Sequence, residues 1–588
     1  MPIYYRPSVK TFYCIVIISC FFVGLANNEV YGQSAAQIDR MEKQIRAMQI
    51  ELKKMKKLQA QREKELKEIK RQAAITANRN NATKSSLPNS NVITTTMADG
   101  SVVYSTNEKP SNRPLLTFGT TDYHREPTAY ARITGTPVPL SASQSEDGFH
   151  KGQFNIGRIS ITLGGFFETA GFYRTRNETA DISSNWNSIP WKNNPNAHTN
   201  EFHMSERQSR ISALVGADVT KAISVSGYTE IDFQGAGSSS NSRQSNSYVP
   251  RVRVLYGEIE NRDDDYYIMG GQSWSLATLF KKGMAVRHEQ VPLVIDAQYV
   301  PGFTWTRNTG VRFVKGFDNH KYHVGIAFEN PQSIWGGTAY IPHGHIITNN
   351  TPGGQVNNPS TTYSTDVAPD IILKVSADPK LGHFESFGML RFVHNRVSHI
   401  GGGQSHTAVA GGGGGGMVIP VIKDKMEFQA SGMAGYGIGR YGVSNLADAT
   451  NKKDGSPALL PEAQTLVGLI GYPTKQIDVY AYGGMEQILS RSGYEVNGKP
   501  YGYGNVHADV SGCQIENAPS TMPCNANIRR VAQGAVGFWW RYLQSDYGTL
   551  SAGAQFSHTD VVGFSGTGGR PHTDDNMAFF SLRYLPFQ

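Results

Sequence analysis

The chain has 588 residues, a formal net charge of +8 and only 18% charged residues, whereas glycine (62), tyrosine (28) and phenylalanine (26) are abundant. This length excludes a single small domain, and no apolar run after residue 30 approaches the ~20 residues that a membrane-spanning helix needs. Residues 33–80 carry 13 Lys and Arg against 6 Asp and Glu, but residues 154–588 carry 35 of each. The basic character therefore belongs to the N-terminal region, and it does not indicate a nucleic-acid-binding protein.

Residues 1–32 have the features of a secretory signal peptide. Arg6 and Lys10 precede an apolar run from Phe12 to Ala26, and Val30 and Gly32 provide a small-residue cleavage region. The run is too short for a transmembrane helix and has the flanks of a cleavable leader. We therefore expect an exported protein.

Residues 36–76 show a heptad repeat in which only Gln59 and Arg62 interrupt the apolar seam. Five heptads with a charged exterior predict a coiled coil, and an apolar seam requires a partner helix. A single amphipathic helix lying on a surface is the alternative. The basic exterior is either a solvated face or a contact with an anionic cell-wall polymer. The apolar seam positions are Ile38, Met41, Ile45, Met48, Leu52, Met55, Leu66, Ile69 and Ala73.

Residues 77–153 are rich in Asn, Ser, Thr and Pro and keep no hydrophobic period. This composition predicts an irregular linker with short extended pieces. The candidate folded domain is therefore residues 154–588.

This domain has the period of two that β-strands show. In Ile223–Gln234, the side chains of Ile223, Val225, Ile231 and Phe233 share one face, and polar side chains occupy the other. The apolar face would form the core of a soluble sandwich or would face lipid in a membrane barrel. The run Gly411–Gly416 lacks the Lys-Ser/Thr of a phosphate loop, so we expect it to allow close packing at a subunit contact or in a crowded lumen.

Connection lengths favour the barrel. Short and long connections alternate along the chain, as in outer-membrane barrels with short periplasmic turns and long outer loops. A sandwich has no reason to alternate so regularly. The fold class predicted is an all-β transmembrane barrel of about 16 antiparallel strands, preceded by the α-helical coiled coil. The expected strands are 159–175, 206–217, 222–234, 250–261, 264–273, 307–316, 320–330, 369–378, 383–394, 407–422, 424–437, 462–473, 476–488, 530–542, 547–558 and 574–587.

The connection from Trp274 to Trp305 is unusually long and shows neither alternation nor a helical stripe. A loop this long in a compact β protein is usually functional. It carries Lys281, Lys282 and Arg287, and we expect it to fold into the barrel and narrow it.

Two cysteines remain after the leader, which holds Cys14 and Cys20. Cys513 and Cys524 are separated by ten residues in a Pro- and Asn-rich stretch. In an exported protein this spacing favours a local disulfide that clips a long loop, with two unpaired thiols as the alternative. A CxxC redox or metal spacing is absent.

The C-terminal segment alternates like a final strand and ends in Phe587 and Gln588. An amphipathic last strand with an aromatic residue at its end is similar to the signal that the barrel-assembly machinery reads. Pro586 and the final Gln depart from the usual pattern, which ends in Phe.

Several specific motifs fall between about residues 205 and 335. These motifs are Ser209-Arg210-Ile211, Gly227-Tyr228 to Asp232-Phe233, Arg251-Val252-Arg253 to Tyr256-Gly257-Glu258, Gly271-Gln272-Ser273-Trp274-Ser275 and Ala327-Phe328-Glu329-Asn330-Pro331. With them, the sequence resembles the DcaP-like trimeric outer-membrane porins, whose architecture of leader, coiled coil, linker and barrel matches nearly the whole chain.

The resemblance implies a homotrimer in the outer membrane, with one pore per subunit and a preference for small organic anions such as dicarboxylates. Passive diffusion of small hydrophilic solutes needs no cofactor and no metal.

A pore of this kind selects solutes by charge and width. Arg can hold a carboxylate with two parallel hydrogen bonds, and strand phasing places several arginines on the inner face. Because acids such as Glu230, Asp232, Glu258 and Glu329 oppose them, a transverse field and structural salt bridges in the wall are the alternatives. The candidate selectivity residues are Lys281, Lys282, Arg287, Arg210, Arg251, Arg253, Arg312 and Arg391, with Arg541 and Arg583 also pointing inward.

Two other functions compete with the porin. One is a structural envelope protein that tethers the outer membrane to the cell wall through the basic coiled coil. The other is a barrel enzyme such as a hydrolase, for which the sequence offers no convincing pair of nucleophile and base.

Overall fold

The computed structural model describes residues 92–96, 102–106, 128–137, 152–235, 249–353 and 362–588. The chain divides into two compact units, Met1–Asn112 and Arg113–Gln588. In the first unit, β1 (Val92–Thr96) and β2 (Val102–Thr106) form a two-stranded antiparallel sheet. The predicted signal peptide (1–32) and coiled coil (36–76) lie outside the described residues and stay predictions.

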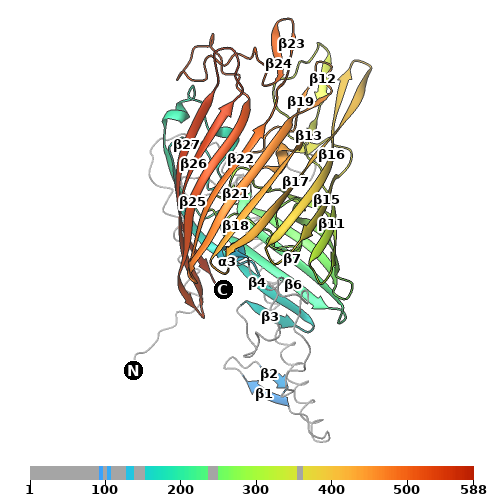
Figure 1. Cartoon of the computed structure of the whole chain (residues 1–588), viewed down its shortest axis with the longest axis vertical. Helices are drawn as coiled ribbons and strands as arrows, with labels where there is room; N and C mark the ends of the chain where they lie inside the picture. The colour runs from blue at the N-terminus through green and yellow to red at the C-terminus, as the bar shows by residue number, and fades with distance from the viewer. Residues whose placement is uncertain (1–91, 97–101, 107–127, 138–151, 236–248, 354–361) are drawn as a thin grey trace, which may run out of the picture. The chain divides into compact units, whose positions relative to one another are not determined.

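The described part of the second unit is a closed antiparallel β-barrel (Figure 1). Sixteen strands form its wall, and the ring closes where β27 pairs with β4. Three short strands, β3 (Gln153–Ile156), β5 (Glu201–Ser205) and β12 (His345–Thr348), each extend the sheet beside one wall strand. The wall strands are β4 (Ile159–Arg174), β6 (Arg210–Asp218), β7 (Ile223–Gly235), β8 (Val249–Asn261), β9 (Tyr266–Trp274), β10 (Arg307–Phe317), β11 (Tyr322–Glu329), β15 (Asp370–Ala377), β16 (His383–His399), β17 (Gly402–Ile422), β18 (Met426–Tyr436), β21 (Pro461–Thr474), β22 (Ile477–Ile488), β25 (Ile528–Ser545), β26 (Gly548–Gly563) and β27 (His572–Leu585).

These are the sixteen strands that the alternation predicted. Short turns gather at one end of the barrel, beside the C-terminus, and long loops gather at the other (Figure 1). One predicted long connection, 395–406, is wrong. β16 and β17 stay paired from His383 opposite Val418 to His399 opposite Gly402, so only Ile400 and Gly401 make the turn. Continued backbone pairing satisfies the polar groups of this segment, which therefore extends as a hairpin.

The two faces of the wall differ as the period of two requires. On β11, Tyr322, Val324 and Phe328 are exposed on the outside, whereas His323 and Glu329 are buried on the inside. The same division holds on β7, where Glu230 and Asp232 are buried. The barrel therefore presents an apolar exterior around a polar interior.

The remaining elements are short. None of the helices among the described residues has the length and apolar character that crossing a membrane would require. Small two-stranded hairpins form within the long loops. These elements are α3 (Ala129–Thr134), η4 (Trp186–Ser188), η5 (Pro195–His198), η6 (Gly439–Tyr441), β13 (Asn350–Pro352), β14 (Thr362–Ser364), β19 (Ala449–Asn451), β20 (Pro457–Leu459), β23 (Ser492–Val496) and β24 (Lys499–Tyr503).

Candidate functional site: the inward-folded third loop

Residues 275–306, here called the third loop, cross the interior of the barrel. The loop leaves β9 and returns to β10, but its middle reaches the opposite wall. There, Trp539 on β25 donates its Nε1 hydrogen to the Leu293 carbonyl oxygen at 2.7 Å, and the Ile295 amide donates to Gln555 Oε1 on β26 at 2.5 Å. Leu293 and Ile295 are fully buried. The expected inward-folded loop is therefore present.

Carboxylates of the wall and turns anchor this loop through its backbone. Glu329 accepts a hydrogen bond from the Leu276 amide at 2.8 Å, and Glu486 accepts one from the Gly302 amide at 2.8 Å. Such charge-assisted bonds are about twice as strong as neutral ones. They fix both arms of the loop to strands that are far apart in the sequence.

A buried lysine completes the anchorage. Lys374 on β15 donates from Nζ to the carbonyl oxygens of Leu276 (3.0 Å) and Thr278 (2.7 Å), and it forms an ion pair with Glu385 at 2.5 Å. Glu385 accepts from the Phe280 amide at 3.1 Å. We call Lys374 and Glu385 the loop clamp. Neither residue was predicted from the sequence, although the alternation along β15 and β16 places both side chains on the inner face of the wall.

A second loop, residues 437–460, also folds inward. Its Tyr441 is fully buried and accepts through its carbonyl oxygen from the Trp305 amide at 3.2 Å. Gln298 donates to the Val443 carbonyl oxygen at 2.7 Å. This loop therefore narrows the lumen together with the third loop, and the sequence did not predict its inward course.

The glycine run of β17 makes room for this packing. A Cβ on Gly416 would lie 2.7 Å from Leu279 Cδ1 of the third loop. The expectation of close packing in a crowded lumen is confirmed for this position.

Most of the predicted arginines point inward, but each is paired. Arg251 and Arg253 bind Asp232 at 2.7 and 3.1 Å, Arg253 binds Glu230 at 2.6 Å, and Arg210 lies 3.8 Å from Glu230.

The other predicted wall arginines are also engaged. Arg391 is held by Asp370 and Asp448, and Arg312 donates to the Trp274 carbonyl oxygen. Arg541 and Arg583 pair with Asp478 and Glu168. The structural salt bridge, which the sequence left open as an alternative, describes all of these contacts except that of Arg312, whose partner is a backbone carbonyl oxygen.

The three basic residues of the third loop lie in two different surroundings. Arg287 is bound to Tyr256 Oη at 3.0 Å and stacks over the Tyr228 ring, 5.5 Å from its centroid. Lys281 forms an ion pair with Glu427, and Lys281 and Lys282 line a cavity of about 840 Å³, here called the vestibule.

The vestibule opens among the short turns and carries a basic excess. Seven Lys and Arg line it against four Asp and Glu, with His288 and His383 also present. The turn lysines 380, 423 and 475 are exposed. The lining cations are Arg132, Lys281, Lys282, Lys380, Lys423, Lys475 and Arg541, and the lining acids are Asp378, Asp424, Glu427 and Asp478.

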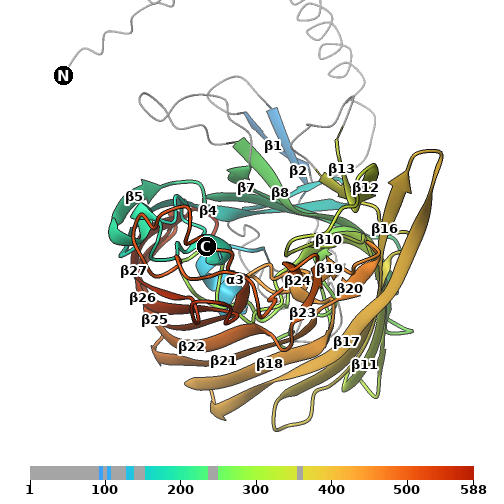
Figure 2. The same ribbon diagram turned by 90° about the horizontal axis from the view of Figure 1, so that it is seen from above.

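A short helix, α3, lies inside the ring of strands (Figure 2). α3 begins after Thr128, whose Oγ1 accepts from the Ala131 amide at 3.1 Å, and ends at Gly135, whose φ is 59°. This glycine sits against the wall, where a Cβ would lie 2.5 Å from the Gly165 carbonyl oxygen. The region predicted as an irregular linker, 77–153, therefore contains a helix, because capping and burial in the barrel stabilise six residues that would not be helical alone.

Glu289 gives the third loop a pH dependence. Its side chain is buried, and burial raises its pKa from 4.5 to about 7. An acid whose pKa is raised on folding contributes stability that is present below its unfolded pKa and is lost as the pH rises through about 7. We expect the free energy of unfolding to fall between pH 5 and pH 8, and we expect Glu289→Gln to flatten that slope. Urea unfolding of the wild type and of the variant at pH 5 and pH 8 measures this pH dependence. The same dependence in both proteins would contradict the role given to Glu289.

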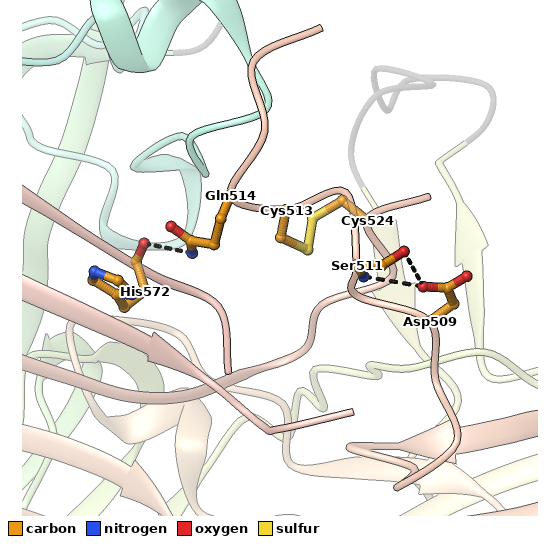
Figure 3. The surroundings of a disulfide bond; sticks show 6 residues. All are labelled: Asp509, Ser511, Cys513, Gln514, Cys524 and His572. Carbon is orange, nitrogen blue, oxygen red and sulfur yellow. Dashed lines mark hydrogen bonds between the residues drawn. A yellow bond between two sulfur atoms is a disulfide. The ribbon is translucent and has the colours of Figure 1, made fainter. Parts of the chain in front are cut away.

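The predicted disulfide is present. Cys513 and Cys524 are joined in the long loop between β24 and β25 (Figure 3). Nearby, Ser511 donates to Asp509, and Gln514 donates to the His572 carbonyl oxygen at the start of β27 (Figure 3). The bridge stabilises a loop at the end of the barrel opposite the vestibule. Among the described residues, no group of three or more His, Cys, Asp or Glu is arranged to hold a metal ion.

A closed sixteen-stranded barrel whose third long loop folds inward defines a porin-type barrel. No family model matches the sequence, and no curated protein matches it. Among solved structures, the outer membrane channel DcaP of Acinetobacter baumannii is similar with a TM-score of 0.52 and 14% identity, over 74% of this chain and 99% of that chain. An anion-selective porin from Comamonas acidovorans matches with a TM-score of 0.40 and 9% identity (73% and 99%), and Salmonella typhi OmpF with 0.39 and 7% (74% and 99%). The resemblance to DcaP-like channels is confirmed as a shared fold.

Proposed function

We propose that the protein is an outer-membrane porin that lets small hydrophilic solutes diffuse passively and favours small organic anions such as dicarboxylates. The closed barrel with an apolar exterior suits a lipid environment. The inward loop supplies a constriction, and the basic vestibule supports the anion preference.

The vestibule is the observation that carries this proposal. Its net positive lining concentrates anions on the short-turn side of the constriction, because a low-dielectric cleft of one charge sign concentrates the opposite ion. Lys281 and Lys282 bring this charge from the third loop itself. The wall arginines contribute less, since their acids neutralise them.

Further features of the proposal follow from the resemblance. The barrel forms a homotrimer, inserts through the barrel-assembly machinery, and places its short turns and N-terminal coiled coil in the periplasm. The tethering alternative rests on residues 36–76, which lie outside the described residues.

We expect the purified protein in a planar bilayer to show an anion-selective reversal potential under a salt gradient. The double variant Lys281→Gln/Lys282→Gln should lower the chloride-to-potassium permeability ratio severalfold, because the vestibule loses two of its seven cations. Arg287 is left intact, since it is buried against Tyr228 and Tyr256 and its removal would also disturb packing.

The matched control is Lys221→Gln/Lys499→Gln, two exposed lysines outside the vestibule lining and outside both inward-folded loops. This control should keep the wild-type ratio. A neutral or cation-selective reversal potential in the wild type would refute the anion preference and would leave a porin without selectivity for anions. The absence of any conductance would refute the porin function itself.

A further inference from the structure

Residues 128–137 are here called the plug segment. They lie inside the barrel between the third loop and the wall, and part of the segment faces the vestibule at the short-turn end. Ala129, Ala131 and Ile133 are buried, yet Thr128 and Arg132 line the vestibule. One side of the segment therefore faces the packed lumen, and the other faces the opening.

Polar groups from across the barrel hold the segment. Arg583 on β27 donates to the Ile133 carbonyl oxygen at 2.9 Å, and the C-terminal Gln588 donates to the Ala131 carbonyl oxygen at 3.0 Å. The Gly165 amide on β4 donates to the Gly135 carbonyl oxygen at 2.9 Å. Arg132 lies 3.7 Å from Asp478 on β22. A segment bound by β4, β22, β27 and the C-terminus spans the lumen.

Tyr130 brings an oxygen into an arginine cluster. Arg210 Nη1 donates to Tyr130 Oη at 2.7 Å, and Tyr130 Oη lies 3.1 Å from Tyr299 Oη, to which Arg253 Nη2 donates at 3.1 Å. The Nε hydrogen of Arg210 is buried and has no hydrogen-bond partner among the described residues. Two phenol oxygens thus occupy the place between two guanidinium groups where an oxyanion would fit.

The cluster has an excess of positive charge. Arg210, Arg251 and Arg253 face only Glu230 and Asp232. Although burial alone would raise it, Arg253, Arg210 and Arg307 lower the pKa of Tyr299 to about 7. The guanidinium groups of this cluster therefore favour negative charge at this point of the lumen.

The segment is less firmly held than the third loop. Its helix has six residues, whereas isolated helices shorter than about 12–15 residues are marginal in water. The buried side chains of the segment are small or medium in size and include Thr128, Ala129, Ala131, Ile133 and Thr134. Tyr130 is only partly buried, and no acid of the wall accepts a hydrogen bond from the segment's backbone amides in the described contacts. The third loop, by contrast, has the loop clamp and Glu486.

We propose that the plug segment is a releasable plug, and that its withdrawal toward the short-turn end opens the lumen and exposes an oxyanion site formed by Arg210 and Arg253. The solute's carboxylate or phosphate oxygen then takes the place of the Tyr130 hydroxyl. This inference rests on the proposed porin function and names its regulation and its internal binding site.

The test compares three proteins in planar bilayers with KCl gradients: wild type, a variant with residues 128–137 replaced by a Gly-Ser segment of equal length, and that variant with Arg210→Gln added. Replacement of the plug should raise single-channel conductance severalfold and shift the reversal potential toward anions. Adding Arg210→Gln should reverse the shift while the conductance gain remains. Wild-type conductance and selectivity in the replaced variant would overturn the plug. Absence of conductance from all three folded proteins would instead refute the porin function on which the plug depends.

A second measurement applies if the replaced variant does not fold. Ala129→Cys places a thiol on the plug segment, and Ala535→Cys places an equally buried thiol in the wall of β25. A water-soluble thiol reagent should modify Cys at 129 much faster than Cys at 535, because only the plug leaves its site. Equal protection of the two thiols would overturn the proposal.

Discussion

Replacing Lys374 with Met is expected to lower the free energy of unfolding by about 3–5 kcal/mol, because removing one partner of a buried ion pair is strongly destabilising. Among the described contacts, Glu385 would keep only the imidazole of His383 as an ion-pair partner, at 3.1 Å. The side chains of Lys374 and Glu385 are 0% and 1% exposed. Met fills a similar volume, but it cannot donate to Glu385 or to the carbonyl oxygens of Leu276 and Thr278. The third loop should therefore loosen, and its cleavage by protease should accelerate.

Urea unfolding of the folded barrel measures this loss, and limited proteolysis locates it. Lys321→Met is the matched control, since this lysine is exposed in a short turn and water screens its pair with Asp318, so the change should leave the free energy of unfolding nearly unchanged. The double variant Lys374→Met/Glu385→Met should recover part of the stability, because no buried charge is then left unpaired. A double variant as unstable as the sum of the single variants would contradict the loop clamp.

The second large effect is expected at Gly302, where the third loop turns back toward β10. Its φ of 92° is a conformation that other residues rarely adopt, and forcing an alanine into it costs about 1–3 kcal/mol. A Cβ would also lie 1.9 Å from the Thr465 carbonyl oxygen of β21. Gly302→Ala should therefore displace this arm of the loop and weaken the bond from the Gly302 amide to Glu486.

Single-channel recording should show an altered conductance in Gly302→Ala, and urea unfolding should show reduced stability. Gly483→Ala on β22 is the control, because its Cβ would meet nothing within 4 Å and its φ is not positive. If both variants behave like wild type, Gly302 does not fix the position of the loop.

The local pattern of the sequence predicted most of the fold. All sixteen wall strands follow from the period of two, since alternation is imposed on each strand separately by the two sides of the wall. The one wrong connection, 395–406, is rich in polar residues and glycine, which suggest a loop. Pairing between β16 and β17 overrides that composition, and pairing is not a local property.

The candidate site was predicted only in part. Strand phase placed Arg210 and Arg391 inside the barrel and was ambiguous for Arg253, and it could not show whether an acid neutralises each arginine. Whether an arginine is neutralised depends on the residues of the neighbouring strand and of the loop that packs against it. Glu230, for instance, meets Arg253 because β7 pairs with β8 across a bulge.

By itself, the sequence determined the class of fold, the order of its strands, the inward third loop and the disulfide of Cys513 and Cys524. Each of these is recorded in spacing or periodicity over a few tens of residues. Only the tertiary structure decided how the lumen is filled. The loop clamp, the inward loop 437–460 and the helix Ala129–Thr134 all join segments that are far apart in the chain. Such contacts form only when the barrel closes and brings its opposite walls within reach of one another.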